Sequence, residues 1–207
     1  MIDLILDDCM NVMKDYDDNY FDLAIVDPPY RNENENQPNK EMRSNRFVKG
    51  QGLGKKPNKE YFDELFRVSK NQIVWGANNF DLPNYKGFVC WKKRTIGENF
   101  NMSMCEIAFI SEKLGTISKF IELAPQGTKD DPRIHPTQKP IKLYQWLLQN
   151  YSKKGEKILD THLGSGSIAI ACHYFGVDLV GVEIDKEYYN KAKDRVKQLT
   201  KQIALDV

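Results

Sequence analysis

A carboxylate at the end of an apolar run, followed by two glycines, is the stretch of this sequence best suited to hold a ligand. Residues 157–160 end in Asp160, and Gly164 and Gly166 follow before an apolar segment at helical spacing. Glycine permits a tight turn and lets backbone N–H groups approach a ligand closely. The next apolar run ends in Glu183, which could accept hydrogen bonds from two ribose hydroxyls. The pattern predicts a nucleoside-binding half of an α/β sheet.

The identity of the nucleoside stays open at this point. Gly164, Gly166 and Ala169, with the later acid, also satisfy the fingerprint of enzymes that bind a nicotinamide dinucleotide. A plain turn from a strand into a helix, with no ligand, is the remaining alternative.

A second candidate site is the tetrapeptide Asp27-Pro28-Pro29-Tyr30, which follows a strand expected over residues 20–26. Neither proline donates an N–H, and their fixed φ angles stiffen the turn. The Asp27 carboxylate and the Pro28 carbonyl can face the same space, beside the Tyr30 ring. Two adjacent acceptors next to an aromatic ring suit a planar amino group on a heteroaromatic base. A turn that only ends the strand is the alternative.

A third motif, His135-Pro136-Thr137-Gln138-Lys139-Pro140, precedes an apolar helical pattern. Pro140 is suited to the first position of that helix. The free N–H groups of a helix N-terminus, with the Thr137 hydroxyl and the Lys139 ammonium nearby, would bind a carboxylate.

Several other segments must position these motifs. Further strands are expected over residues 2–6, 72–75, 88–91, 106–110, 116–123 and 179–182, and further helices over 9–13, 61–70 and 186–202. The expected strand just before Asp27 is almost continuously apolar, as in a sheet covered on both faces. The alternation of strands and helices predicts one α/β domain over residues 1–207.

The composition limits the class of protein. At 207 residues, with 41% hydrophobic and 11% aromatic residues, the chain can form one core. No apolar run approaches the length of a membrane span, and the N-terminus has no basic-then-apolar signal, so we expect a cytoplasmic protein without membrane contact. The three histidines and four cysteines lack ligand or disulfide spacing, so we expect no metal.

The charge is distributed unevenly although the formal net charge is only +1. Residues 1–30 contain eight acids and one lysine, whereas residues 31–60 contain eight Lys or Arg and four acids. We expect residues 31–60 to form a mobile loop or insertion that could follow a phosphate backbone, or simply be solvated. The candidate nucleic-acid-binding residues are Arg43, Arg46, Lys49, Lys55 and Lys56.

The three motifs, in this order, resemble those of the S-adenosylmethionine-dependent DNA amino-methyltransferases. The similar enzymes are the permuted group in which the catalytic motif precedes the cofactor motif, and Asp8-Cys9 resembles their N-terminal acid-Cys element. The resemblance covers nearly the whole chain except residues 31–60 and 111–134. It implies a doubly wound, Rossmann-like methyltransferase fold with a mostly parallel sheet, and it leaves residues 111–134 as a short target-recognition segment.

The resemblance also implies the roles of individual residues. Asp27 and Pro28, with Pro29 in the same motif, would receive the target amino group, and Tyr30 would stack on the target base. Glu183 would hold the ribose hydroxyls and Asp8 the adenine amino group of the cofactor. Thr137 and Lys139 would lie near its methionine end. The full cofactor site implied is Asp8, Cys9, Thr137, Lys139, Asp160, Leu163, Gly164, Ser165, Gly166, Glu183 and Ile184. Leu163 departs from the family, which usually has phenylalanine there.

The implied reaction is direct methylation of a flipped-out adenine in DNA at its N6 amino group. The aspartate at position 27 favours adenine by analogy, and N4 of cytosine, an RNA base or a protein amide are the closest alternatives. A nicotinamide oxidoreductase lacks a second mononucleotide half here. The intact motifs argue against a non-catalytic nucleic-acid-binding module. A homodimer is left open.

Overall fold

The computed structural model describes residues 1–30, 55–100, 102–125 and 131–201. They form one eight-stranded sheet in the order β1-β8-β7-β2-β3-β5-β4-β6. Five neighbouring strand pairs are parallel, and only the pairs that involve β5 are antiparallel. The strands are β1 (Ile2–Leu6), β2 (Leu23–Val26), β3 (Gln72–Trp75), β4 (Phe88–Lys93), β5 (Cys105–Ile110), β6 (Lys119–Leu123), β7 (Lys157–Asp160) and β8 (Asp178–Glu183).

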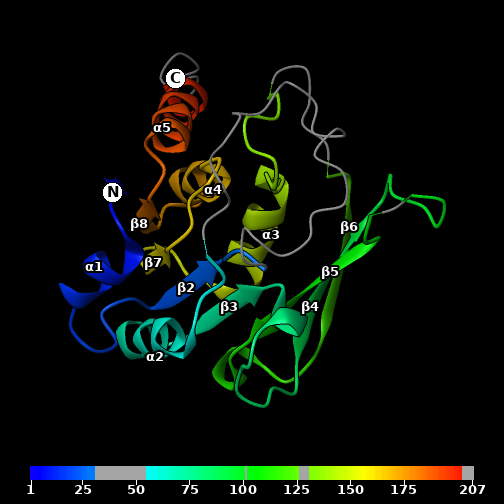
Figure 1. Cartoon of the computed structure of the whole chain (residues 1–207), viewed down its shortest axis with the longest axis horizontal. Helices are drawn as coiled ribbons and strands as arrows, with labels where there is room; N and C mark the ends of the chain where they lie inside the picture. The colour runs from blue at the N-terminus through cyan, green and yellow to red at the C-terminus, as the bar shows by residue number, and fades with distance from the viewer. Residues whose placement is uncertain (31–54, 101, 126–130, 202–207) are drawn as a thin grey trace.

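Helices cover both faces of the central strands (Figure 1). Alternate residues of β2 point to opposite faces, so Leu23 and Ile25 enter one core and Ala24 and Val26 the other. Because both faces are buried, the strand is apolar throughout. The first core is closed by α3 (Ile141–Tyr151), α4 (Ser167–Phe175) and α5 (Lys186–Thr200), and the second by α1 (Cys9–Lys14) and α2 (Lys59–Val68).

The helix before the glycine turn begins one residue later than predicted. Pro140 has an extended ψ of 141° and is the N-cap of α3, and Ile141 is the first helical residue. The strands expected over residues 20–26 and 116–123 are also shorter, since they begin at Leu23 and Lys119.

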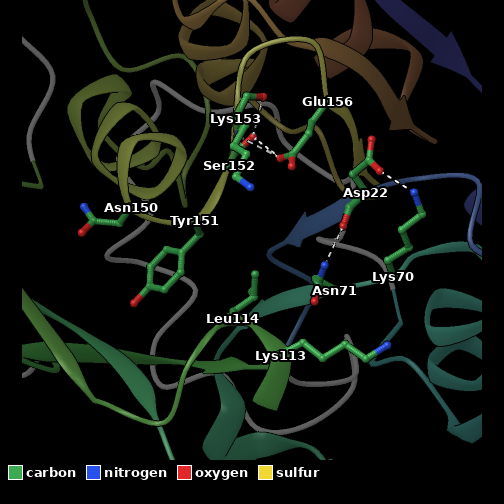
Figure 2. A pocket seen from close by; sticks show the side chains of 10 residues that line it. All are labelled: Asp22, Lys70, Asn71, Lys113, Leu114, Asn150, Tyr151, Ser152, Lys153 and Glu156. Carbon is green, nitrogen blue, oxygen red and sulfur yellow. Dashed lines mark hydrogen bonds and ion pairs between the residues drawn. The ribbon is translucent and has the colours of Figure 1, made fainter.

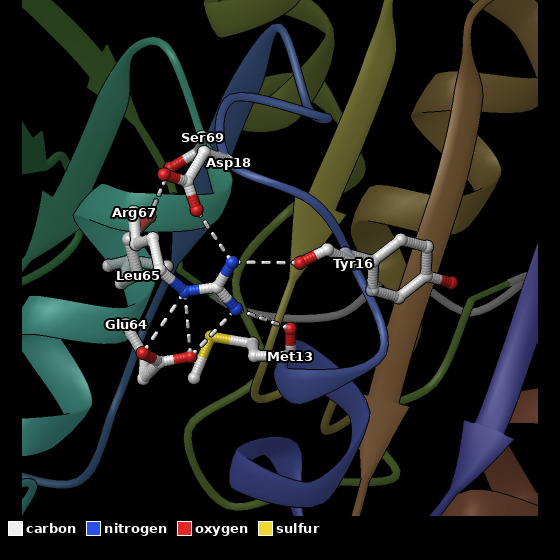
Figure 3. A network of polar contacts seen from close by, with 7 residues as sticks. All are labelled: Met13, Tyr16, Asp18, Glu64, Leu65, Arg67 and Ser69. Atoms are coloured by element: carbon white, nitrogen blue, oxygen red, sulfur yellow. Dashed lines mark hydrogen bonds and ion pairs between the residues drawn. The ribbon is translucent and has the colours of Figure 1, made fainter.

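Arg67 of α2 stabilises the connection between α1 and β2 through hydrogen bonds (Figure 3). Its guanidinium donates to the carbonyl of Met13 at 3.0 Å, near the C-terminus of α1, and to that of Tyr16 at 2.9 Å. Asp18 and Glu64 are its ion-pair partners, each at 2.9 Å. A helix C-terminus has carbonyls without intrahelical partners, so this side chain satisfies groups that would otherwise need water.

The segment predicted to recognise the target extends the sheet. Of residues 111–134, Glu112–Leu114 form a 3₁₀ turn and Lys119–Leu123 form β6, the edge strand next to β4. No helix among the described residues has the length and apolar character needed to cross a membrane.

Candidate active site

The three sequence motifs meet at one edge of the sheet. Strand β7 lies between β2 and β8, and both of these pairs are parallel, so the three strands end at the same side. Asp27 follows β2, Asp160 ends β7 and Glu183 ends β8. Ligands of doubly wound folds bind outside these carboxyl ends. We therefore take this edge as the candidate active site.

The glycine turn between β7 and α4 requires glycine for two reasons. Gly164 and Gly166 have φ of +52° and +72°, the left-handed region that other residues rarely adopt. A Cβ on Gly166 would also lie 3.0 Å from Val196 of α5. On Gly164 it would lie 3.5 Å from the ring of His135, so the third motif borders the turn.

Glu183 is fixed by the turn that it faces. Its Oε2 accepts from the Gly164 N–H at 2.8 Å and its Oε1 from the Asp185 N–H at 2.9 Å. A carboxylate has about four lone-pair sites, so each oxygen retains one for a further donor. Burial raises the pKa of Glu183. The next side chain, Ile184, is 65% exposed and offers an apolar surface beside these oxygens.

Asp160 is the last residue of β7, beside Gly181 of β8, and is almost inaccessible. Its Oδ1 accepts from the His162 N–H at 3.0 Å. Burial, with further contributions from Asp27 and Glu183, raises its pKa to about 8. Asp160 thus supports the turn from below rather than presenting a charge to a ligand.

Asp8 and Cys9 lie at the start of α1, beside the end of β1. The Asp8 side chain caps this helix by accepting from the Met10 N–H at 2.8 Å, and it is exposed. Burial and the neighbouring Asp8 raise the pKa of Cys9 to about 12. A thiol with that pKa is a poor nucleophile, so Cys9 is suited to packing.

Asp27 is bonded on both oxygens by side chains of this protein. The Tyr30 hydroxyl donates to Oδ1 at 2.7 Å, and the Lys139 ammonium lies 2.5 Å from Oδ2. Pro28 is buried and Pro29 is half-buried between them. The Tyr30 ring lies against Gly76, whose added Cβ would be only 2.2 Å from the ring.

Lys139, which the resemblance places near the methionine end of the cofactor, pairs with two carboxylates of the protein. Its ammonium is buried between Asp27 and Glu106, at 2.5 and 3.1 Å, rather than at a free helix N-terminus. Thr137 is exposed, and its N–H and hydroxyl face His135 Nδ1 at 3.3 and 3.1 Å. Burial lowers the pKa of His135 to about 4, so the ring is neutral at pH 7.

Leu163, which the resemblance places at the cofactor, is almost completely buried. Its side chain is 4% exposed and belongs to the core, where it packs against Gly181 of β8. Leucine is thus used here for core packing beneath the turn.

Two further residues of this region, Glu106 and Arg195, were not singled out in the sequence. Glu106 is the second ion-pair partner of Lys139 described above. Arg195 of α5 donates to the Ser165 carbonyl at 2.6 Å and pairs with Asp131 at 2.7 Å, which ties the glycine turn to the segment before His135. Ser165 is itself buried, with its hydroxyl 3.1 Å from that of Ser167. Charged residues dispersed along the chain carry no local pattern that would have identified them.

The predicted basic region is described only in part. Arg43, Arg46 and Lys49 lie outside the described residues. Lys55 and Lys56 are exposed, and the Lys56 ammonium is 5.9 Å from the centre of the Phe80 ring.

A hollow of about 390 Å³ lies apart from these motifs, near the beginnings of β2 and β3 (Figure 2). Its polar side chains are paired partly with one another, as in Asp22 with Lys70 and Glu156 with Ser152. None of the residues predicted for the site lines it. Within the described ranges no three His, Cys, Asp or Glu residues are grouped to hold a metal ion.

Comparison with known proteins identifies the relatives of this chain. Residues 92–194 match the family model N6_N4_Mtase, described as DNA methylase. Type II methyltransferase M.HpaI of Haemophilus parainfluenzae is 39% identical over 62 residues, which are 30% of this chain. That match spans only 20% of the Haemophilus protein.

Solved structures share the fold over nearly the whole chain. The M1.HpyAVI–SAM complex is 20% identical with a TM-score of 0.59, and the match covers 94% of this chain and 100% of that one. PvuII DNA methyltransferase (cytosine-N4-specific) is 9% identical with a TM-score of 0.63, and the match covers 98% and 92%. The predicted Rossmann-like methyltransferase fold with a mostly parallel sheet is confirmed.

Proposed function

We propose that this chain, whose residues 92–194 match the N6/N4 DNA methylase family model, transfers a methyl group from S-adenosylmethionine to N6 of adenine in DNA. The observation that carries the proposal is the meeting of Asp27-Pro28-Pro29-Tyr30 with the glycine turn at the carboxyl ends of β2 and β7. This arrangement brings acceptors for an amino group next to a nucleoside site. It also assigns a role to the motifs at residues 27–30 and 135–140, which binding of a nicotinamide dinucleotide would not explain.

The residues around the turn fit S-adenosylmethionine. Glu183 retains one lone-pair site on each oxygen for the ribose hydroxyls, and the exposed Ile184 can cover an adenine ring. The exposed Asp8 carboxylate can accept from the adenine amino group. The N–H groups of Gly164 and Gly166 are bonded within the protein, to Glu183 at 2.8 Å and to the Leu163 carbonyl at 3.0 Å, so the turn holds Glu183 in place beside the ligand site. The cofactor supplies a methyl group on a positively charged sulfur, which makes the methyl carbon electrophilic.

Asp27 and Pro28 would align the target amine. An exocyclic amino nitrogen is a weak nucleophile because its lone pair is delocalised into the ring. The Asp27 carboxylate and the Pro28 carbonyl would accept hydrogen bonds from its two N–H groups. These hydrogen bonds would direct the lone pair towards the methyl carbon. Bound S-adenosylmethionine would supply the methyl group, with the electron pair of the broken carbon–sulfur bond left on sulfur, and the methylated nitrogen would release its extra proton to solvent. Alignment and preorganised charge then account for the catalysis.

Adenine is favoured over cytosine by the first residue of the motif. Aspartate at this position resembles the adenine enzymes, whereas serine is commoner in the cytosine enzymes. N4 of cytosine is the second candidate, because that amine also presents two N–H bonds and because PvuII methyltransferase, whose fold this chain shares, is cytosine-N4-specific.

DNA would reach the site as a flipped-out base, since a base inside a duplex cannot contact Asp27. We propose that residues 1–207 act as one methyltransferase domain, that the basic residues of 31–60 follow the phosphate backbone and that residues 111–134 contribute to target recognition.

Identification of the methylated nucleoside tests the proposal directly. The protein is incubated with unmethylated genomic DNA and S-adenosylmethionine labelled on its methyl group, and the DNA is digested to nucleosides. We expect the label in N6-methyl-2′-deoxyadenosine. Label in N4-methyl-2′-deoxycytidine would move the proposal to the second candidate, and absence of label from DNA, with RNA or protein labelled instead, would overturn it.

A further inference from the structure

Glu106 is a partly buried carboxylate of β5 that the proposed reaction does not use. Two lysines from separate parts of the chain approach it, Lys93 of β4 at 2.6 Å and Lys139 at 3.1 Å. The Tyr30 hydroxyl is a further 3.5 Å contact. All of these groups have little solvent around them, since the side chains of Lys93, Lys139 and Glu106 are 10%, 3% and 19% exposed. Such a group is costly to bury and is retained only with partners.

Lys139 connects this carboxylate to the catalytic motif. It bridges Glu106 and Asp27, and its ammonium lies 5.3 Å from the centre of the Trp75 ring. A lysine with one carboxylate partner could swing about its flexible stem, because its ammonium is a compact charge with rotatable donors. Two carboxylates and an aromatic face define its position from three sides.

The same contacts determine the orientation of the Asp27 carboxylate. The Tyr30 hydroxyl and the Lys139 ammonium each take one lone-pair site, on different oxygens, and both donors also face Glu106. The sites left on Asp27 therefore have a fixed direction. We propose that Glu106 is a positioning residue of methyl transfer, which holds Lys139 and Tyr30 so that Asp27 presents its remaining acceptor sites to the target amine. This inference rests on the proposed function.

The charge of Glu106 matters as well as its shape. Burial alone would lower the pKa of Lys139, but Asp27 and Glu106 outweigh burial and raise that pKa above its usual value. Loss of the Glu106 charge should let Lys139 lose its proton at lower pH. The other titratable or charged groups around this ammonium are Tyr30, Lys93, Arg133, His135, Tyr144 and Asp160.

Three variants separate positioning from general stability. Glu106→Gln keeps the shape and removes the charge, Glu106→Asp keeps the charge on a shorter side chain, and Glu187→Gln is the control. Glu187 also pairs with a lysine, Lys191 of α5 at 2.7 Å, but that pair is exposed. For each variant we would measure thermal unfolding, S-adenosylmethionine affinity by calorimetry and the single-turnover methylation rate of unmethylated genomic DNA between pH 6.5 and 10.

We expect Glu106→Gln to bind S-adenosylmethionine within threefold of wild type and to transfer the methyl group roughly 10- to 100-fold more slowly at pH 7.5. The deficit should grow with rising pH as Lys139 deprotonates. Glu106→Asp should recover part of the rate with the wild-type pH profile, and Glu187→Gln should match wild type.

A Glu106→Gln rate within twofold of wild type at every pH would overturn the inference. So would a deficit that is constant with pH and accompanied by an equal loss of cofactor affinity. If Glu106→Gln does not fold, Glu106→Asp decides the matter, because a wild-type rate in that variant also contradicts positioning. Failure of the proposed function is distinguishable, since the wild-type protein would then label no DNA.

Discussion

The ammonium of Lys139 lies 2.5 Å from Oδ2 of Asp27, in a position where the lysine side chain is only 3% exposed. The two residues belong to motifs that are far apart in the sequence, and each motif alone suggests a different partner. Their contact joins the predicted amine-binding turn to the segment that leads into the cofactor half. It makes Asp27 the centre of the first prediction.

Asp27→Ala should nearly abolish methyl transfer and preserve the cofactor site. Removal of one preorganised polar group typically slows a reaction about 100- to 1,000-fold, and Asp27 also aligns the nucleophile. Cofactor affinity should stay within about tenfold, roughly 1.4 kcal/mol, because Glu183 and the glycine turn lie on other strands. Single-turnover methylation and cofactor titration of one preparation measure both. Near-normal turnover would contradict the assigned role of the motif.

Glu183→Ala should weaken S-adenosylmethionine binding. The ribose hydroxyls would lose a charged acceptor worth roughly 1.5–3 kcal/mol, and the N–H groups of Gly164 and Asp185 would lose theirs. Calorimetry measures the change. Glu187→Ala is the control, because its carboxylate pairs with Lys191 on the exposed side of α5. Unchanged affinity in the Glu183 variant, or tight NADH binding by wild type with no heat from S-adenosylmethionine, would refute the cofactor assignment.

Gly76→Ala should displace the Tyr30 ring and slow methyl transfer. The glycine has φ of +70°, and an added Cβ would lie 2.2 Å from the ring. Gly155→Ala is a matched control, since Gly155 has φ of +83° but open space around its Cβ position. Both variants should lose comparable stability from backbone strain, on the order of 1 kcal/mol. Only the first should lose methylation rate, and equal rates in the two would show that Tyr30 placement is unimportant.

Asp160→Asn should raise stability at alkaline pH. The pKa of Asp160 is about 8 in the folded protein, because of burial, whereas that of an unfolded aspartate is about 3.9. Because the pKa of Asp160 is higher in the folded than in the unfolded protein, its protonation contributes to the free energy of unfolding. This contribution is complete below about pH 4 and is lost as the pH rises through about 8. The loss should amount to at most roughly 1.4 kcal/mol per pH unit in that interval.

Urea unfolding of wild type and Asp160→Asn at pH 5, 6.5, 8 and 9 would measure this effect. Asparagine retains an oxygen that can accept from the His162 N–H. The pKa values of His135 and His162, both lowered to about 4 chiefly by burial, affect the two proteins alike. The difference in free energy of unfolding between the two proteins therefore reports on Asp160 alone. We expect this difference to favour the variant increasingly above pH 5. A difference independent of pH would show that Asp160 is ionised in the folded state at neutral pH.

Neutralisation of Arg43, Arg46, Lys49, Lys55 and Lys56 should weaken DNA binding and reduce its dependence on salt. Each phosphate contact removed should flatten the slope of log affinity against log salt by roughly one unit. Cofactor affinity should be unchanged. Filter binding at several salt concentrations measures this, with neutralised Lys186, Lys193 and Lys197 of α5 as the control. Wild-type affinity and slope in the first variant would identify residues 31–60 as merely solvated.

The local secondary structure and the turns of this protein could be predicted from its sequence alone. Continuous apolarity predicted the central strand before Asp27, and the spacing of Gly164, Gly166 and Glu183 predicted the strand-turn-helix-strand unit. Prolines and glycines gave the turns. These features depend on backbone geometry and on burial of both faces of a strand, which neighbouring residues determine. The mostly parallel sheet follows from the same alternation of strands and helices.

The pairing of charged side chains from distant segments could be seen only in the tertiary structure. Glu106 faces Lys139 because β5 inserts antiparallel between β3 and β4, an order that no local pattern encodes. The burial of Leu163 beneath the turn likewise depends on β8. Ion pairs and core contacts between distant segments depend on strand order, and strand order is set by the packing of the whole sheet.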